Sequence, residues 1–343
     1  MKNLVIRGDA SSEIGIGHVM RCLALAQAWQ DIGGRATFIT AMEAPGLRTR
    51  LEAEGMRVVQ LSAIAGTWED AAQTLHHARE IGAAWVVVDG YQFSSGYQRA
   101  FQDAGLKLLF LDDDGRARHY YADLVLNQSL HGDASLYSQR EPYTRLLLGT
   151  RYALLRREFL DWRQWQRVTP AISRRVLVTL GGSDPDNTTL RVIQALQEID
   201  TSDLDVKVVI GPSNPHVKSL KGAMLSAPCS IQILQNVIAM PELMAWADVA
   251  LSAGGSTCWE LAFMGLPFIV MVLAGNQEGI ADGLDRKGLA IRLQRPETAA
   301  ITDALAALLP DQKTREGMSV KGRALVDGYG ASRVTEVLRK NCL

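Results

Sequence analysis

The stretch LVIRGDASSEIGIGH (residues 4–18) joins a short apolar run to a glycine-rich turn. A helical pattern follows at residues 19–31, and two glycines stand at 33–34, where glycine commonly terminates a helix. The expected strand at residues 4–7 begins with three successive apolar side chains, as in a strand buried on both faces of a parallel sheet. Strand, glycine-rich turn and helix in this order predict the first unit of a doubly wound α/β domain.

The same alternation continues along the first half of the chain. Strands are expected at residues 36–40, 57–61, 85–89, 108–112 and 124–127, and helices at 45–54, 68–81 and 95–104. It restarts in the second half, with strands expected at 175–180, 206–211, 231–234, 249–253, 267–273 and 290–293, and helices including 190–198, 241–247 and 257–264. Residues 314–340 are expected to be helical with no strand after them.

Two Rossmann-like α/β domains in tandem follow from this pattern. The expected N-terminal domain spans residues 1–155, a charged and aromatic linker 156–172, and the C-terminal domain 173–320. A final helical segment, 321–343, is expected to pack back on the N-terminal domain. Ligands of open α/β sheets bind beyond the carboxyl ends of the strands, so we expect a polar cleft with the two domains facing across it.

Composition excludes several classes of protein. Among 343 residues, 36 basic and 37 acidic side chains give a net charge of −1. A charge this close to zero gives no reason to expect binding to a nucleic acid or an anionic membrane. The four cysteines are scattered without a CxxC pair, so neither a disulfide framework nor a zinc site is expected and a cytoplasmic location fits. No signal peptide is expected, and the longest apolar run, 266–274, is about half of what a membrane helix needs.

The turn before the first helix has two competing interpretations. Gly15 and Gly17 lie where backbone N–H groups can approach an anion, yet Met20 stands where the dinucleotide fingerprint has its third glycine. A lone GxG can equally be only a turn. His18 lies at the expected helix start, where a neutral imidazole could act as a general base, or could merely cap or pack.

A second glycine-rich turn, Gly254-Gly255-Ser256-Thr257, also follows an apolar strand and precedes a helix. Such a turn suits the diphosphate of a nucleotide, and Glu260, one turn into the helix, could accept both ribose hydroxyls. The alternative is a tight turn with a solvated glutamate. Asn276 and Gln277 follow the next strand and could bind a sugar or nucleotide, or start a helix as caps.

For most of the remaining acidic residues and histidines we expect structural or surface positions. Asp9 could orient His18 or a substrate hydroxyl, whereas Glu13 in mid-loop is expected to be solvated. Asp112, Asp113 and Asp114 are consecutive, and adjacent strand residues point to opposite faces, so we expect a charged loop start rather than a metal site. Surface positions are expected for His76, His77 and His119.

Several motifs together resemble a known family. They are IRGDASSEIGIGHVMRCLALA (6–26), VVDGY (87–91), LDDDG (111–115), ADLVLNQ (122–128), LVTLGGSDP (177–185) and SAGGSTCWELAFMGLP (252–267). They look like the UDP-2,4-diacetamido-2,4,6-trideoxy-β-L-altropyranose hydrolase family of pseudaminic acid synthesis, a pathway that serves flagellin glycosylation. The resemblance implies the GT-B architecture of MurG-like glycosyltransferases and metal-independent hydrolysis, without a cofactor, by water attack with inversion. It also implies possible contact with other enzymes of the same sugar pathway.

The resemblance also assigns roles by position. His18 matches the histidine that activates the water, with Asp9 and Tyr91 as further catalytic candidates. The substrate-binding candidates are Gly15, Ile16, Gly17, Asn127, Gly181, Gly182, Ser183, Gly254, Gly255, Ser256, Thr257, Glu260, Asn276 and Gln277. Tyr91 matches the tyrosine of a DHY segment, but Gly90 replaces its histidine, which puts the identity of the sugar in question. A glycosyltransferase with an acceptor, and a noncatalytic nucleotide-sugar sensor, remain alternatives.

Overall fold

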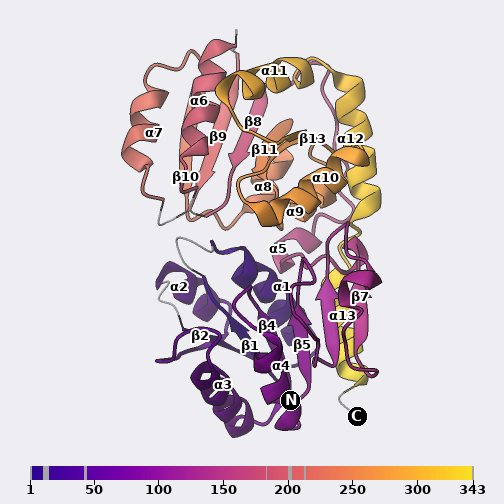
Figure 1. Cartoon of the computed structure of the whole chain (residues 1–343). Helices are drawn as coiled ribbons and strands as arrows, with labels where there is room; N and C mark the ends of the chain where they lie inside the picture. Colours follow the sequence, from indigo (N-terminus) through magenta and orange to yellow (C-terminus); the bar gives the residue numbers. More distant parts are fainter. Residues whose placement is uncertain are drawn as a thin grey trace. The chain divides into compact units, whose positions relative to one another are not determined.

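The computed structural model describes residues 2–10, 15–41, 45–182, 184–199, 203–211 and 214–341. The chain divides into two compact units, the first made of Met1–Arg157 with Gly328–Leu343 and the second of Glu158–Asp327. Each unit has a parallel sheet with helices packed on it (Figure 1). The two Rossmann-like units expected from the alternating pattern are therefore present.

The sheet of the first unit has seven parallel strands in the order β3-β2-β1-β4-β5-β6-β7. The strands are β1 (Asn3–Gly8), β2 (Arg35–Thr40), β3 (Arg57–Gln60), β4 (Ala83–Asp89), β5 (Leu108–Leu111), β6 (Leu124–Asn127) and β7 (Arg145–Leu148). The helices are α1 (Gly17–Asp31), α2 (Pro45–Ala53), α3 (Trp68–Glu80), α4 (Ser95–Asp103) and α13 (Gly330–Lys340), with short 3-10 turns η1 (Ala134–Tyr137) and η2 (Thr150–Tyr152). Strand β7 and both 3-10 turns were not expected from the sequence.

Strand β1 is buried on both faces of this sheet. Leu4 and Ile6 belong to one apolar cluster and Val5 to another, and all three side chains are inaccessible to solvent. Successive strand residues point to opposite faces, so helices must cover both sides. The order places β1 beside β4, so the turn after β1 and the residues that end β4 lie at the same edge of the sheet.

The second unit contains a six-stranded parallel sheet in the order β10-β9-β8-β11-β12-β13. Its strands are β8 (Arg175–Thr179), β9 (Asp205–Ile210), β10 (Ser230–Gln235), β11 (Val249–Ala253), β12 (Phe268–Met271) and β13 (Ala290–Leu293). Its helices are α5 (Arg157–Leu160), α6 (Thr188–Glu198), α7 (Val217–Met224), α8 (Met240–Trp246), α9 (Thr257–Phe263), α10 (Glu278–Arg286), α11 (Thr298–Leu308) and α12 (Gln312–Leu325), with the 3-10 turn η3 (Gly275–Gln277).

Two expected boundaries differ from those of the compact units. The units divide after Arg157, so most of the stretch expected as a linker belongs to the second unit. There Arg167 donates to the backbone carbonyls of Met244 and Ala247. The expected continuous helix at 314–340 is two helices, because Gly328 adopts a left-handed conformation (φ 79°) between α12 and α13.

Helix α13 belongs to the first unit although the whole second unit precedes it in sequence (Figure 1). Val334 and Leu338 are fully buried in the same apolar cluster as α1 residues, and the Trp85 indole donates to the Leu338 carbonyl at 3.0 Å. Gly330 permits this approach, since a Cβ there would lie 2.1 Å from the Ala153 carbonyl oxygen.

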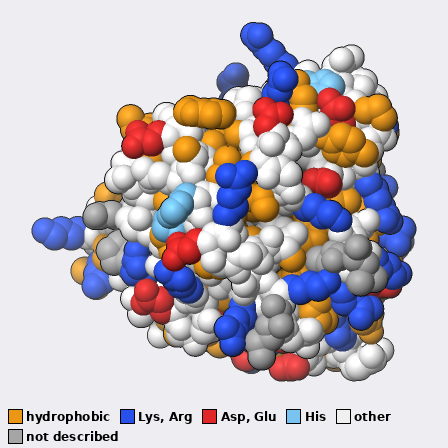
Figure 2. Space-filling model, turned by 90° about the horizontal axis from the view of Figure 1, so that it is seen from below, with side chains coloured by type: hydrophobic (Ala, Val, Ile, Leu, Met, Phe, Trp, Pro, Cys, Tyr) orange, Lys and Arg blue, Asp and Glu red, His pale blue; other side chains and the backbone are white. Residues whose placement is uncertain are grey.

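The surface carries interspersed charges of both signs. Figure 2 shows basic, acidic and apolar side chains mixed over one face of the molecule. Within the described ranges, no helix is both long enough and apolar enough to cross a membrane.

Candidate active site

His18 and Asp89 form the centre of the candidate site. Helix α1 begins at Gly17, which places His18 in its first turn, and Asp89 is the last residue of β4. The His18 Nδ1 lies 2.6 Å from Asp89 Oδ1, and the aspartate is inaccessible to solvent. Arg21 Nη2 also lies near this nitrogen, at 3.2 Å, but the carboxylate is closer and only accepts hydrogen bonds, which favours the tautomer with the proton on Nδ1. The lone pair of a neutral imidazole is then on Nε2, where it can accept a proton.

Arg21 lies one turn along α1 and binds two aspartates at once. Its Nε and Nη2 donate to the two oxygens of Asp89, both at 2.6 Å. Its Nη1 donates to both oxygens of Asp113, in the loop after β5, at 2.8 and 2.9 Å. The guanidinium is almost completely buried, so these charge-assisted hydrogen bonds fix the position of Asp89 against His18.

The ion pairs keep Asp89 ionised. Burial raises the pKa of this carboxyl, but the positive charge of Arg21 and the contact with His18 outweigh burial and hold the pKa well below its usual range. Burial lowers the pKa of Arg21, yet Asp113 and Asp89 raise it well above its ordinary value. The carboxylate that holds His18 is therefore a permanent negative charge at neutral pH.

Tyr91 and Arg116 cover this centre from the pocket side. The Tyr91 ring packs edge-on against the imidazole, with ring centroids 4.9 Å apart, and its hydroxyl donates to Asp113 Oδ2 at 3.4 Å. Arg116 lies over the Tyr91 ring at 4.6 Å and pairs with Asp114 at 2.5 Å. An aromatic ring and a cation therefore stand beside the proposed base.

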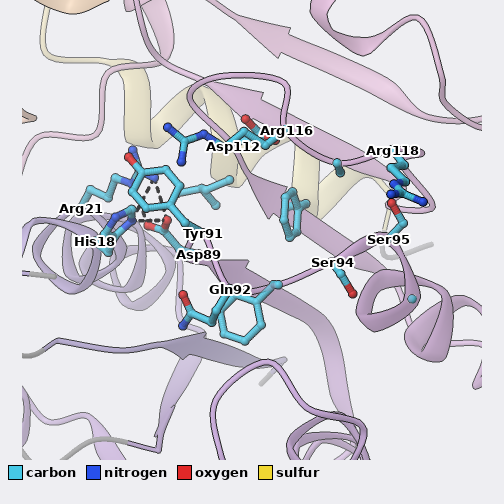
Figure 3. Close-up of a pocket in the computed structure, with 16 residues that line it drawn as sticks. His18, Arg21, Asp89, Tyr91, Gln92, Ser94, Ser95, Asp112, Arg116 and Arg118 are labelled. Atoms are coloured by element: carbon cyan, nitrogen blue, oxygen red, sulfur yellow. Dashed lines mark hydrogen bonds and ion pairs between the residues drawn. The ribbon is translucent and has the colours of Figure 1, made fainter. Parts of the chain in front are cut away.

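These side chains line a pocket of about 420 Å³ in the first unit. His18, Arg21 and Asp89 lie at one end, while Ser94, Ser95 and Arg118 lie at the other (Figure 3). The other lining residues are Gly90, Tyr91, Gln92, Phe93, Gly96, Phe110, Leu111, Asp112, Arg116 and Ala117. This volume, with polar groups at both ends and aromatic rings along the wall, is typical of a site for a small molecule.

Asp9 does not orient His18. Its Oδ1 accepts from the Thr40 hydroxyl at 2.9 Å and from the Ala41 N–H at 2.8 Å, and Arg7 pairs with it at 2.8 Å. Its Oδ2 accepts from the Gln92 amide at 3.0 Å. Burial raises the pKa of Asp9, but Arg7 and the other donors lower it overall. Asp9 therefore binds residues at the end of β2 and the loop that contains Gln92. The carboxylate beside the imidazole is that of Asp89.

The glycine-rich turn is described only in part. Gly15 has a left-handed conformation (φ 76°), and Ile16 precedes α1 without a side-chain cap. Gly17 is the first residue of the helix. Residues 11–14, including Glu13, lie outside the described residues.

Asn127 stabilises a loop of the first unit through buried hydrogen bonds. Its side chain is inaccessible to solvent; its amide donates to the Asp113 carbonyl at 3.0 Å and to the Tyr137 hydroxyl at 2.8 Å. Its Oδ1 accepts from the Ser129 N–H. These contacts hold the loop that carries Asp113, so Asn127 is not placed to touch a substrate.

Asp112, Asp113 and Asp114 bind three different partners rather than converging. Asp112 accepts from the Tyr120 hydroxyl at 2.6 Å, whereas Asp113 holds Arg21 and Asp114 holds Arg116. The charged loop start expected from the sequence is present, and its middle member reaches the candidate site.

The structure brings two candidate segments of the second unit together. Gly254 follows β11, and a Cβ there would lie 3.0 Å from both the Cβ and the carbonyl oxygen of Gln277 in η3. Gln277 also accepts from the Leu273 N–H at 2.9 Å. The segment that carries Asn276 therefore packs on the turn of Gly254, and the half-buried residues of this turn and helix are Gly255, Ser256, Thr257 and Glu260.

The turn after β8 has a different construction. Gly181 is exposed with a left-handed conformation (φ 93°), and Gly182 packs so closely on Gly211 that a Cβ at Gly211 would lie 1.8 Å from the Gly182 carbonyl oxygen. Ser183 lies outside the described residues. Asp184 accepts from the backbone N–H groups of Thr188 and Thr189, both at 2.8 Å, and so starts α6.

A protein-family model matches most of the second unit. Residues 176–325 match the glycosyltransferase family 28 C-terminal domain. The matched segment, called the family 28 domain below, covers the six strands of the second sheet except the first residue of β8, and includes the glycine-rich turn after β11.

Curated relatives cover both units. The chain is 25% identical over 291 residues to the UDP-2,4-diacetamido-2,4,6-trideoxy-beta-L-altropyranose hydrolase of Campylobacter jejuni, covering 84% of this chain and 98% of that protein. It is 28% identical to the spore coat polysaccharide biosynthesis protein SpsG of Bacillus subtilis, over 68% of each chain. It is 27% identical to the uncharacterized protein MJ1062 of Methanocaldococcus jannaschii over 78% of this chain, and spans about half of that relative (55%). The resemblance to the hydrolase family is thereby confirmed.

Solved structures with a similar fold superpose on nearly the whole chain. MurG of Acinetobacter baumannii superposes with a TM-score of 0.67 at 16% identity, covering 99% of this chain and 100% of that one. The spinosyn rhamnosyltransferase SpnG complexed with thymidine diphosphate gives 0.67 at 17% identity, covering 98% and 100%. The expected GT-B type fold is confirmed.

Proposed function

We propose that the chain hydrolyses a UDP-linked diacetamido-trideoxy-hexose, releasing UDP and the free sugar. The observation that carries the proposal is the His18–Asp89 pair at the end of a small-molecule pocket, 2.6 Å apart and held by Arg21. The name of the curated relative from Campylobacter jejuni supports this substrate class.

In the proposed reaction, water attacks the anomeric carbon. A bond forms between the water oxygen and this carbon, the bond from the carbon to the diphosphate oxygen breaks, and its electron pair leaves with UDP. The water proton passes to Nε2 of His18, and Asp89 stabilises the imidazolium that forms. Attack opposite the leaving group inverts the anomeric centre. UDP is already a good leaving group, so positioning and proton removal supply most of the required catalysis, and we propose that no metal is needed.

We further propose that the family 28 domain binds the nucleotide. Gly254 and Gly255 lack side chains, so the backbone of the turn can approach a phosphate closely. The Ser256 hydroxyl makes no capping bond to α9 and can donate to phosphate. Glu260 is half-buried one turn into α9 and is proposed to accept the ribose hydroxyls. The match of this segment to a glycosyltransferase domain supports the proposal.

Time-resolved NMR with candidate UDP-diacetamido-sugars and the pure protein, with no acceptor added, tests the reaction. We expect stoichiometric free sugar and UDP, with the inverted anomer formed first and mutarotating later. An EDTA-treated sample should show the same rate. No free sugar from any candidate, or the retained anomer formed first, would contradict the proposal.

A glycosyltransferase is the second candidate, because the family 28 match and the MurG and SpnG structures belong to glycosyltransferase-type proteins. A transferase holds the UDP-sugar until an acceptor takes the sugar. Negligible turnover without acceptor, together with tight UDP binding, would favour this candidate over the hydrolase.

A further inference from the structure

Four charged or titratable groups in the candidate site form one buried chain of contacts. His18 contacts Asp89, Arg21 binds Asp89 through Nε and Nη2, and Nη2 also lies 3.2 Å from His18 Nδ1. The third guanidinium nitrogen, Nη1, binds Asp113. Their exposed fractions are 9% for His18, 0% for Asp89, 7% for Arg21 and 7% for Asp113. Charges this poorly solvated influence one another strongly.

The charges of these four contacting groups do not sum to zero while the imidazole is neutral. One guanidinium stands against two carboxylates, which leaves a net charge of −1. Proton uptake by His18 makes the four groups neutral overall. Asp89 alone would be cancelled by Arg21, so the negative charge that an imidazolium compensates is contributed by Asp113.

Other described groups near His18 do not replace this contribution. Arg116, over the Tyr91 ring, is paired with Asp114. Asp114 also faces His131, which lies 2.9 Å from the Asp113 carbonyl oxygen, so the charge of Asp114 is directed to these two groups. Asp112 lines the pocket and keeps its charge, but its oxygens accept from the Tyr120 hydroxyl and the backbone N–H groups of Asp114 and Gly115, so in the described part of the chain it is not hydrogen-bonded to His18 or Arg21. The Cys22 thiol, whose pKa burial raises well above its ordinary value, stays neutral. Tyr91 contacts both His18 and Asp113 and carries no charge.

We propose that Asp113 is a positioning residue that sets the proton affinity of His18 through Arg21, without touching the imidazole or the substrate. Its charge balances that of Arg21, so that Asp89 keeps its full attraction for the imidazolium formed during the reaction. On the pocket side, Tyr91 links the two ends of this set of contacts, because its ring packs on the imidazole of His18 and its hydroxyl donates to Asp113. The inference rests on the proposed role of His18 as base.

Titration of the protein without ligand, followed by NMR of histidines labelled with 13C at Cε1, tests this. The His18 signal is identified by its absence from His18→Asn. In Asp113→Asn we expect the midpoint of the His18 titration to fall by about 0.5–1 pH unit, the size expected when one nearby charge is lost. Asp113→Glu, which keeps the charge, should restore a midpoint close to that of the wild type.

The matched control is Asp103→Asn, the same change at an exposed position of α4, where the carboxylate lies 3.8 Å from Arg99 Nε. It should leave the His18 midpoint unchanged, and circular dichroism should show that every variant is folded. If Asp113→Asn does not fold, Asp113→Ser makes the same charge change with a smaller side chain. A folded, charge-neutral variant with the wild-type midpoint would overturn the inference.

Kinetics separate this inference from the proposed function. The acid limb of the kcat/KM profile should move by the same amount as the NMR midpoint. If the midpoint moves and the protein hydrolyses no UDP-sugar, the role of Asp113 stands and the proposed function fails. If hydrolysis is observed and neither the midpoint nor the acid limb moves, the proposed function stands and the inference fails.

Discussion

At the scale of single residues, His18 decides the proposed reaction. His18→Asn keeps a polar side chain but no group that accepts the water proton, so turnover should fall by about 10²–10⁴-fold with a smaller change in KM. The measurement is UDP release at saturating sugar nucleotide. His76→Asn, an exposed histidine on α3, is the control and should keep wild-type activity. UDP release by His18→Asn at near the wild-type rate would remove His18 from the mechanism.

Asp89 should also make stability depend on pH. Its folded-state pKa is depressed, so its contribution is fully present above the unfolded value of about 4 and is lost as the pH falls toward the folded value. Asp89→Asn should therefore cost about 3 kcal/mol of unfolding free energy at pH 7, because it leaves Arg21 with one buried partner fewer. The gap to the wild type should narrow in urea titrations between pH 4 and pH 2.5. A gap independent of pH would show that Asp89 does not act through its charge.

At the scale of elements, the loop from β4 to α4 depends on a glycine. Gly90 has φ 153°, and a Cβ there would lie 2.6 Å from Gln92 Oε1 and 2.9 Å from the Phe93 ring. Gly90→Ala should cost about 1–3 kcal/mol and displace Gln92 from Asp9, raising KM because this loop lines the pocket. Gly317→Ala on α12, where an added Cβ would meet no described atom within 4 Å and which does not line the pocket, is the control and should be neutral or stabilising. Equal KM values for the two variants would contradict this role of Gly90.

The elements also show what the sequence could predict. Alternating short apolar runs and helical patterns predicted twelve of the strands. Burial on both faces explains the uninterrupted apolar runs of β1, β5, β6 and β12, whereas β3 and β10 are half-exposed. Strand β7 was not predicted although it contains three consecutive leucines, of which only Leu147 is buried. The sequence pattern indicated His18 as a candidate base, and it offered Asp9, in the same loop, as a residue that could orient His18 or a substrate hydroxyl. The strand order sets the true partner, since β4 lies beside β1 and delivers Asp89. Arg21, inside an apolar helical run, gave no signal, because only tertiary contacts reveal its two aspartates.

At the scale of the whole molecule, the chain leaves the first unit, builds the second, and returns to the first through α13. Leu338 on this helix is fully buried, and its carbonyl accepts from Trp85 of β4. Leu338→Ala should destabilise the first unit by about 2–5 kcal/mol through the cavity that it leaves. Hydrogen exchange should then show faster exchange of β4 amides, while amides of β8 and β11 in the second unit keep their protection, because the two units have separate cores. Lys340→Ala, two residues further on and exposed, should change stability by no more than about 0.5 kcal/mol. Equal loss of protection in both units would mean that they unfold as one cooperative body, and that α13 stabilises the whole chain rather than the unit to which it returns.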